Sequence, residues 1–317
     1  MSSTSEPLRA PADVNWLRDA KVISIVAIAH FVSHVYIMLL PPIFLLVKDH
    51  FNASYAEIAF AITAYNVMSA LLQTPAGFMV DRIGARVMLT GGLILSGIAI
   101  CVAALLPGYW FFLIGYALLG VANTVYHPAD YSILSATVDG KRMGKAFSIH
   151  TFAGYLGSGV MPAIVVGAVA LWGWNGGFIC AAILSFAAAL LLMVTGSVLP
   201  RAPRKVAAEQ GKKGDGKVGL DLLLSGPILR NLLFFTCIGM ANGGIQTFSV
   251  VALGMLWGTP AATANLGLTG FLLMSAAGVL LGGTIGIGTL VYAVSIGPLA
   301  HFFVPAFTVR SPLPQPA

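Results

Sequence analysis

The sequence Gly77-Phe-Met-Val-Asp81-Arg82-Ile-Gly84-Ala-Arg86 is a short charged segment between two long apolar runs. The run before it covers about residues 56–80, and the run after it covers about residues 87–106. Each run has the roughly 20 residues that a helix needs to cross about 30 Å of hydrocarbon. This arrangement predicts two transmembrane helices joined by a loop at the membrane surface.

The composition extends this interpretation to the whole chain. Of 317 residues, 58% are hydrophobic and only 9% are charged, and the mean hydropathy is +0.89. Because lipid offers no partner for free backbone polar groups, helices are the expected element. We therefore predict an all-α integral membrane protein whose main partner is the lipid bilayer. The three cysteines all lie in apolar runs, so no disulfide framework is expected.

Interruptions by charged or turn-forming residues divide the apolar sequence into spans. Seven are clear, at about residues 22–47, 56–80, 87–106, 110–136, 147–171, 177–199 and 232–256. The stretch 264–305 has no Asp, Glu, Lys or Arg and is about twice the length of one span. Divided near residues 282–288, it gives two more helices. The sequence thus predicts about nine spans.

Basic residues occur on alternate loops. They precede the first span, lie between spans 2 and 3 and between spans 4 and 5, and follow span 6, whereas the opposite loops carry little besides Lys48. Since positive residues tend to stay in the cytoplasm, we expect a cytoplasmic, uncleaved N-terminus in a bacterial-type inner membrane. The net charge of +6 follows from this topology and gives no reason to expect nucleic acid.

A polar segment divides the chain. Residues 201–227 are rich in Lys, Gly and Ala and have no apolar periodicity, which is typical of a flexible linker. We expect a six-helix bundle over residues 1–200, a basic cytoplasmic linker over 201–227, and a partial second transmembrane region with a disordered tail over 228–317.

The charged segment resembles the G-x-x-x-D-R-x-G-x-[RK] signature of the major facilitator superfamily, whose transporters have two six-helix halves. The resemblance implies that Gly77 allows close helix packing and that Gly84 allows a tight turn. It implies that Asp81 latches the two halves together at a helix N-terminus. Arg82 and Arg86 would then lie at the inner membrane surface.

Two further motifs resemble the fosmidomycin-resistance-like branch of that superfamily. They are His30-Phe-Val-Ser-His34-Val-Tyr36 followed by Leu40-Pro41-Pro42, and Tyr126-His127-Pro128-Ala-Asp130-Tyr131. The acidic residue usual near the second histidine of span 1 is absent. The resemblance covers about residues 20–200 and does not identify the substrate.

The C-terminal part departs from the superfamily plan of about twelve spans. About 25 residues of the C-terminal tail, from about Thr284, weakly resemble the tail of a small bacterial membrane protein group, the YczE/YitT-like proteins. The resemblance lies in Thr284-Ile-Gly286-Ile-Gly288-Thr289 and Ile296-Gly297-Pro298-Leu299. We therefore expect an incomplete second half. Such a chain either assembles with a second chain, as in a homo-oligomer, or does not transport.

Ionisable groups at hydrocarbon depth are costly and usually face a cavity or a partner. His30 and His34 share one face of span 1, and His127 and Asp130 share one face of span 4. The superfamily resemblance implies that both helices line a central cavity. Our hypothesis is a site where Asp130 exchanges a proton and the histidines respond to substrate. Two alternatives stay open: hydrogen bonds that only hold the bundle together, and a divalent metal site.

Uncharged polar side chains within the spans add candidate substrate contacts, although each could equally join two helices. They are Tyr65, Asn66, Gln73, Asn123, Asn242 and Gln246. We include Asn66 and Gln73 in the predicted site. His150 opens span 5, and we expect it at the level of the lipid headgroups.

These observations predict a secondary active transporter that moves a small organic solute and is driven by a proton gradient, with efflux as one direction considered. The alternative is a truncated or fused membrane protein that acts only as a partner or is inactive. No nucleophile elbow, P-loop or zinc-protease motif is present. We accordingly expect no enzymatic activity, no cofactor and no resident metal.

Overall fold

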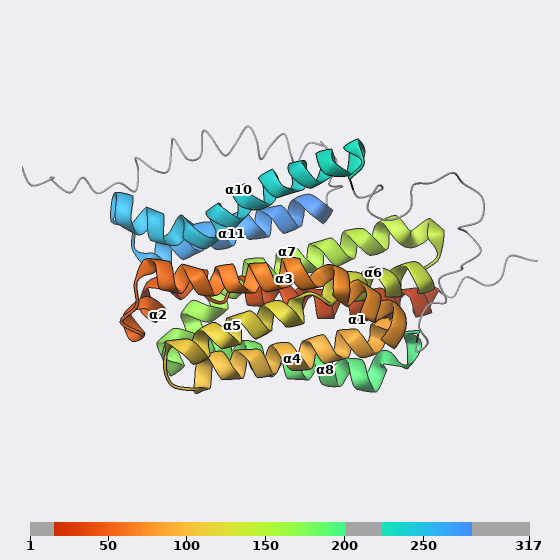
Figure 1. Cartoon of the computed structure of the whole chain (residues 1–317), viewed down its shortest axis with the longest axis horizontal. Coiled ribbons are helices and arrows are strands. Elements are labelled where there is room, and N and C mark those ends of the chain that lie inside the picture. The colour runs from red at the N-terminus through yellow and green to blue at the C-terminus, as the bar shows by residue number, and fades with distance from the viewer. Residues whose placement is uncertain (1–15, 201–223, 281–317) are drawn as a thin grey trace, which may run out of the picture.

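A computed structural model describes residues 16–200 and 224–280 of the chain. Within these ranges the protein is a bundle of roughly parallel and antiparallel α-helices (Figure 1). Seven segments are long and apolar enough to cross a membrane: Trp16–His50, Tyr55–Ile83, Ala85–Leu105, Tyr109–Thr137, Gly140–Trp172, Gly176–Val198 and Ala261–Val279. The predicted all-α membrane architecture is therefore confirmed.

The helices follow the predicted order. They are α1 (Trp16–Ile37), η1 (Pro41–Ile43), α2 (Phe44–His50), α3 (Tyr55–Ile83), α4 (Ala85–Leu105), α5 (Tyr109–Asn123), α6 (Tyr126–Thr137), η2 (Gly140–Arg142), α7 (Met143–Trp172), α8 (Gly176–Thr195), η3 (Gly196–Val198), α10 (Gly226–Trp257) and α11 (Ala261–Leu280). The helix expected over 232–256 is α10, which is not among the seven segments above. The predicted ninth span, most of the linker and the tail lie outside the described residues.

Two predicted spans are interrupted. The first breaks after Ile37 and continues through η1 into α2, where Pro41 and Pro42 stand. The fourth breaks between Asn123 and Tyr126, so α5 and α6 together make one crossing. Both breaks interrupt the regular backbone hydrogen bonding at membrane depth, which is tolerated where the backbone is buried in protein.

The ends of α3 show how local sequence sets the helix limits. Ser54 forms a capping box with Glu57, each side chain bonding the other residue's backbone N–H. At the other end, Gly84 has φ 107° and ψ 136° and separates α3 from α4. A residue with a side chain rarely adopts this conformation, so the tight turn expected at Gly84 is present.

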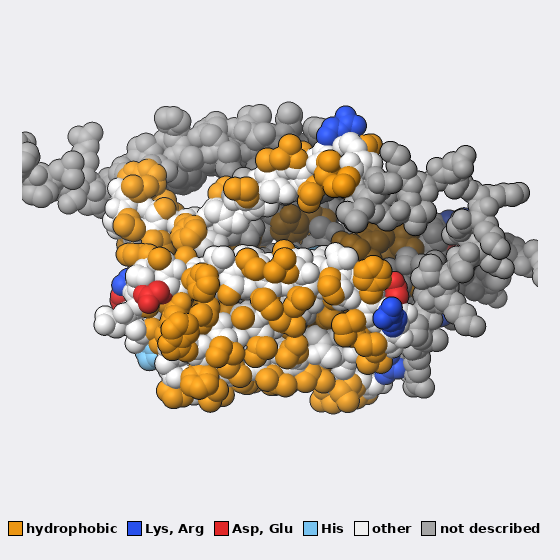
Figure 2. Space-filling view, in the orientation of Figure 1, with side chains coloured by type: hydrophobic (Ala, Val, Ile, Leu, Met, Phe, Trp, Pro, Cys, Tyr) orange, Lys and Arg blue, Asp and Glu red, His pale blue; other side chains and the backbone are white. Residues whose placement is uncertain are grey.

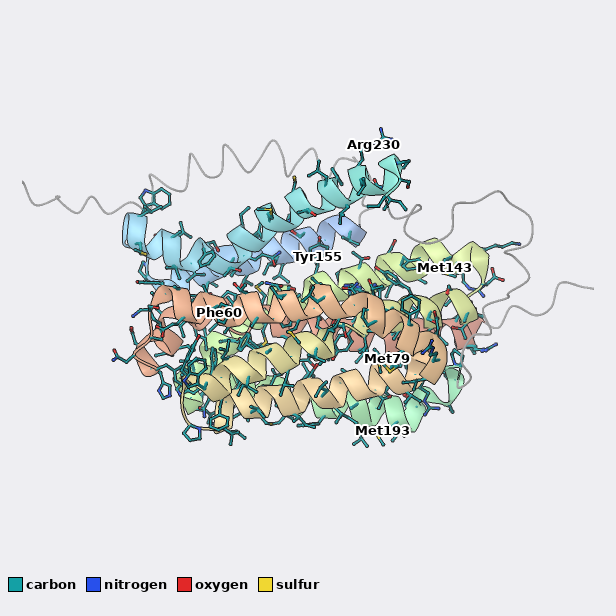
Figure 3. All side chains as sticks on the ribbon, viewed as in Figure 1. Phe60, Met79, Met143, Tyr155, Met193 and Arg230 are labelled. Atoms are coloured by element: carbon teal, nitrogen blue, oxygen red, sulfur yellow. The ribbon has the colours of Figure 1, made fainter. Side chains whose placement is uncertain are left out.

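The surface is that of a membrane protein. Figure 2 shows hydrophobic side chains over the middle of the bundle, with charged side chains gathered mostly at its two ends. Large apolar side chains face outward along this belt, including Phe60 and Met79 on α3 and Met193 on α8, which are 55%, 46% and 57% exposed (Figure 3). In water this exposure would promote aggregation, but lipid is its natural partner.

Helix α7 lies between the first helices and the last. It packs against α1 on one side and against α11 on another, and α10 with α11 forms a layer over the rest of the bundle (Figure 1). The amide of Asn265 in α11 reaches the break in the first span, because its Nδ2 donates a hydrogen bond to the Pro42 carbonyl at 3.1 Å. One side chain therefore joins segments at opposite ends of the sequence.

Candidate functional site

The predicted histidines and aspartate converge inside the bundle. Asp130 of α6 is fully buried, and its Oδ2 accepts a hydrogen bond from His150 Nε2 of α7 at 3.0 Å. The same oxygen lies 3.5 Å from His30 Nδ1 of α1. The rings of His34 and His127 lie 4.5 and 5.1 Å from the His30 ring, centre to centre. We call these five residues the histidine–aspartate cluster.

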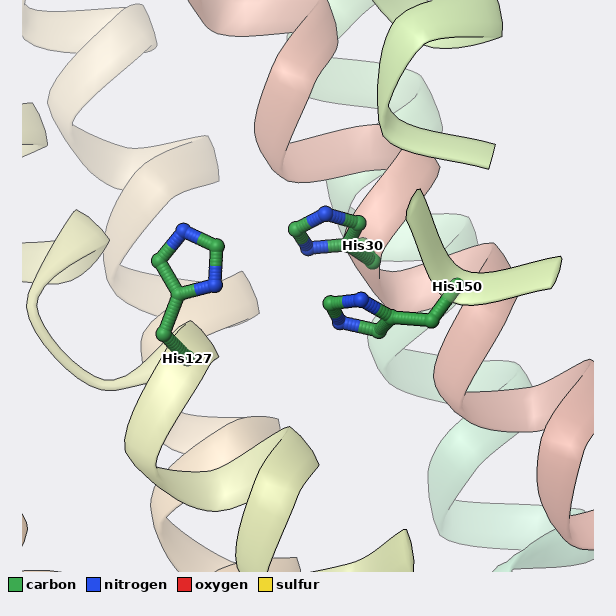
Figure 4. A group of neighbouring side chains, drawn as sticks. All are labelled: His30, His127 and His150. Atoms are coloured by element: carbon green, nitrogen blue, oxygen red, sulfur yellow. The ribbon is translucent and has the colours of Figure 1, made fainter. Parts of the chain in front are cut away.

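Two of the rings are stacked. Those of His30 and His150 lie 3.6 Å apart at 20°, and His127 faces them from α6 (Figure 4). His34 is held from the side by Ser158, whose Oγ is 3.2 Å from His34 Nδ1. Helix α1 thus meets α6 and α7, which lie about 100 residues later in the sequence, in one cluster.

The break in the fourth span positions one side of the cluster. Helix α6 starts at Tyr126, so His127 and Asp130 stand in its first turns, directly after the interruption. Pro128 is compatible with this place because a helix's first N–H groups have no partner within the helix. The Tyr126 hydroxyl is 2.9 Å from Ser96 Oγ of α4, which ties the start of α6 to the bundle.

Glycines bring α1 and α7 close enough for their histidines to meet. A Cβ at Gly154 would lie 2.7 Å from His30 Nε2 and 2.9 Å from His34 Nε2, and one at Gly157 would lie 2.3 Å from the Phe31 carbonyl oxygen. Such approaches exclude any larger residue without a shift of α1. These two glycines of α7 therefore serve close helix packing.

The cluster is under-satisfied in hydrogen bonds. Among the described residues, His30 Nδ1, His127 Nδ1 and Asp130 Oδ1 are buried without a hydrogen-bond partner. An unpaired buried polar group costs about 1–3 kcal/mol, so its presence calls for a functional explanation. One nitrogen from each of His30, His127 and His150 lies within 4.8 Å of the others. A metal ion could bridge such a set, so this alternative remains an untested prediction.

Asn66 lies in a different place from the cluster. It lines a cavity of about 210 Å³ between α3 and α10, to which the segment around Tyr36 and the middle of α5 also contribute. We call it the tyrosine cavity. Its larger polar side chains are Tyr36, Tyr65, Asn66, Tyr116, Asn242 and Gln246. The predicted substrate contacts are thus divided between two sites, and Gln73 is exposed on α3 and lines neither of them.

The residues of the charged signature lie at the α3–α4 junction. Asp81 and Arg82 are exposed at the end of α3, and Asp81 has no ion pair or hydrogen bond of its side chain within the described ranges. Arg86 donates from Nη2 to the Met193 carbonyl of α8 at 3.1 Å. The latch role of Asp81 therefore stays a prediction.

The expectation for Gly77 is wrong for the helices that the structure describes. A Cβ there would meet nothing within 4 Å, so Gly77 does not mark a close helix contact among them. Close contacts occur instead at other glycines, including some of α5 and α7. At Gly120, for example, an added Cβ would lie 2.4 Å from the Tyr65 carbonyl oxygen.

The expectation for His150 is also wrong. It is only 2% exposed and bonds to Asp130, because α7 begins at Met143 and so carries His150 two turns into the bundle. The signal that identifies it is its spacing: His150 lies one turn before Gly154 and shares its helix face. A histidine alone or a glycine alone in the sequence does not reveal that His150 lies beside Asp130.

Comparisons with known proteins agree with the fold. The fosmidomycin resistance protein of Escherichia coli K12 is 26% identical over 273 residues, which cover 84% of this chain and 64% of that protein. The quinolone resistance protein NorB of Staphylococcus aureus is 27% identical over 219 residues, covering 65% and 46%. This chain thus spans under two thirds of the length of these relatives.

A solved structure has the same fold. A bacterial homologue of the human lysosomal transporter Spinster, in an inward-facing and occupied conformation, superposes with a TM-score of 0.64 at 16% identity. The match covers 83% of this chain and 60% of that one.

The family model described as Major Facilitator Superfamily matches residues 26–311. The match extends through the tail that weakly resembles another group and covers most of the sequence. The chain belongs to the major facilitator superfamily.

Proposed function

We propose that the chain is a proton-coupled secondary transporter of a small organic solute, in which Asp130 carries the transported proton. The observation that supports this most is the burial of Asp130 against His150 and His30 inside a lipid-facing bundle. A carboxylate is costly at that depth unless it is paired or protonated. A group in this position changes its charge state when its partners move, which is what coupling requires.

The histidines give the proton alternative positions. An imidazole exchanges protons near neutral pH and presents two distinct ring nitrogens. In the cluster, Asp130 has one oxygen bonded and the other unpaired. Rocking of α1 against α7 would change the contact of His30 with Asp130, and so link proton transfer to helix movement.

Membership of the superfamily makes this a solute-transport protein by class. Relatives named for resistance to fosmidomycin and to quinolones favour export. We further propose that the end of the bundle bearing the α3–α4 and α6–α7 loops faces the cytoplasm, because the basic residues of the spanning region concentrate there.

The test is flux in proteoliposomes under an imposed pH gradient, with a panel of small solutes and with the gradient applied in either direction. Asp130→Asn keeps the size of the side chain and removes its charge. We expect gradient-driven flux in the intact chain and its loss in this variant. Asp49→Asn is the matched control, because Asp49 pairs with Lys48 outside the cluster.

Gradient-driven flux that survives in Asp130→Asn would refute the assigned role. The alternative function is a membrane component without transport of its own. That alternative predicts no flux for any solute in the intact chain. Light scattering of the purified protein then tells whether active preparations contain one chain or a homo-oligomer.

A further inference from the structure

The tyrosine cavity contains hydrogen-bonding groups but no charge. Among the described residues that line it, none is Asp, Glu, Lys, Arg or His. Its polar groups are phenol hydroxyls from α1, α3 and α5, an amide from α3, and two amides and the Thr247 hydroxyl from α10. Amides and hydroxyls both donate and accept. The cavity therefore matches a solute with both donors and acceptors.

Two of the buried phenol hydroxyls have no partner. Tyr65 and Tyr116 are only 7% and 4% exposed, yet their hydroxyls make no hydrogen bond with any described residue. A buried hydroxyl in this state is destabilising, because it has lost water and gained no partner. By contrast, Tyr36 on the same wall is 2.6 Å from Ser185 Oγ and is satisfied. The unpaired pair thus marks where a ligand's polar atoms gain most.

The absence of charge decides between solute classes. An ion moved from water into a site with no opposite charge loses its hydration without compensation, which is strongly unfavourable. A neutral hydroxyl loses far less hydration free energy than an ion. It would regain this free energy through hydrogen bonds to Tyr65 and Tyr116. The cavity consequently favours uncharged solutes over acids or amines of the same shape.

The size and shape of the tyrosine cavity further restrict the class of solute that it can bind. The cavity has about 210 Å³, below the 300–1,000 Å³ that is usual for drug-sized ligands. Gly239 and Gly243 on α10 leave its wall without side chains at two points. Aromatic rings opposite them offer flat apolar faces to the carbon skeleton of a ligand.

We infer that the tyrosine cavity binds a neutral, hydroxyl-rich solute no larger than a monosaccharide. This inference rests on the proposed function, since it names the class of solute that would be carried. The histidine–aspartate cluster contributes no residue to the cavity, so solute selection and proton exchange fall to separate groups.

The test measures binding without any gradient, in purified full-length protein. A cysteine replaces Thr247, which lines the cavity, after Cys101, Cys180 and Cys237 are changed to alanine. The rate of maleimide labelling is then measured with three probes of one ring shape: D-galactose, D-galacturonate and D-galactosamine. Glycerol and myo-inositol extend the neutral set. Ala262→Cys is the control, because it lines a separate cavity of about 370 Å³.

We expect neutral probes to protect Thr247→Cys at concentrations at least about ten-fold lower than the acid or the amine, and not to protect Ala262→Cys. Adding Tyr65→Phe and Tyr116→Phe removes only the two hydroxyls and should weaken protection about ten-fold or more. Tyr155→Phe, whose side chain lines neither cavity, should leave it unchanged.

Two results would overturn the inference. One is protection by galacturonate or galactosamine at concentrations equal to or below those of the neutral probes. The other is no protection by any neutral probe up to its solubility limit, in a protein whose Thr247→Cys labels readily. Because no gradient is used, either result leaves the Asp130 flux experiment to be judged separately.

Discussion

The α1–α7 interface and the α3–α10 interface hold polar groups in opposite ways. At the first, glycines bring two helices so close that titratable side chains touch one another. At the second, tyrosines and amides surround a cavity and several of them touch nothing polar. Close packing suits charge that moves over short distances, whereas an open cavity suits a solute that arrives from outside.

The largest effect is expected where the tight interface is forced apart. Gly157→Leu places carbon atoms against the backbone of Phe31, so α1 must shift or the fold must strain. Overpacking of this kind costs about 1–3 kcal/mol, occasionally more. Thermal unfolding in detergent should show a clear drop in Tm. Gly144→Ala, where nothing lies within 4 Å, should show none, and equal losses would mean that α1 and α7 are not closely packed.

The next effect comes from unpairing the cluster. His150→Leu removes the hydrogen bond to the buried Asp130, which should cost about 1–3 kcal/mol of stability. Replacing both partners removes both ends of this bond, so the His150→Leu/Asp130→Leu double variant should lose less than the two single variants together. Unfolding curves for the four proteins complete the cycle, and simple additivity would show that the bond contributes nothing.

Removing different hydroxyls from the wall of the tyrosine cavity should change the stability of the protein in opposite directions. Tyr36→Phe removes a bonded hydroxyl and leaves Ser185 with one partner fewer, at a cost of about 1 kcal/mol. Tyr65→Phe removes an unpaired one and should leave the free protein as stable or slightly more stable. Tm values measured without added solute would contradict this contrast if both variants lost stability equally.

The smallest effect on stability is expected at Asn66. Its side chain is exposed, lines the cavity and makes no hydrogen bond with the described residues. Asn66→Ala should therefore change the free energy of unfolding by no more than about 0.5 kcal/mol. Its effect should appear in transport instead, as a raised KM with kcat retained. A large loss of Tm would instead assign Asn66 a structural role.

Much of the architecture could be predicted from the sequence because the positions of the helices follow from one property, the hydrophobicity of the segments that lie in lipid. Apolar runs between charged loops predict the helices to within a few residues, as α4 at Ala85–Leu105 against the expected 87–106 shows. The convergence of His30 with Asp130 followed from helical spacing and from the superfamily resemblance. The two broken spans were not predicted, because a helix break at depth depends on what packs beside it.

His150 and Gly77 show the limits of prediction from sequence in two ways. His150 is more deeply buried than predicted, and Gly77 makes no close helix contact although one was predicted. A histidine near a predicted helix end has no mark that separates the headgroup region from the interior, and an error of about four residues in the helix start decides between them. A glycine in a motif has no mark for what stands opposite it. Both depend on tertiary contacts, which one sequence does not contain.

The hydrogen bond between Asn265 and the Pro42 carbonyl joins residues 223 positions apart. Chains are synthesised at about 5–20 residues per second, so roughly 10–45 s pass between the appearance of the proline and that of the asparagine. Throughout this interval the first span is in the membrane without the hydrogen bond from Asn265 to the Pro42 carbonyl. The Pro41–Pro42 end of span 1 is therefore completed only by the last described helix. A chain whose synthesis stops before α11 lacks this hydrogen bond.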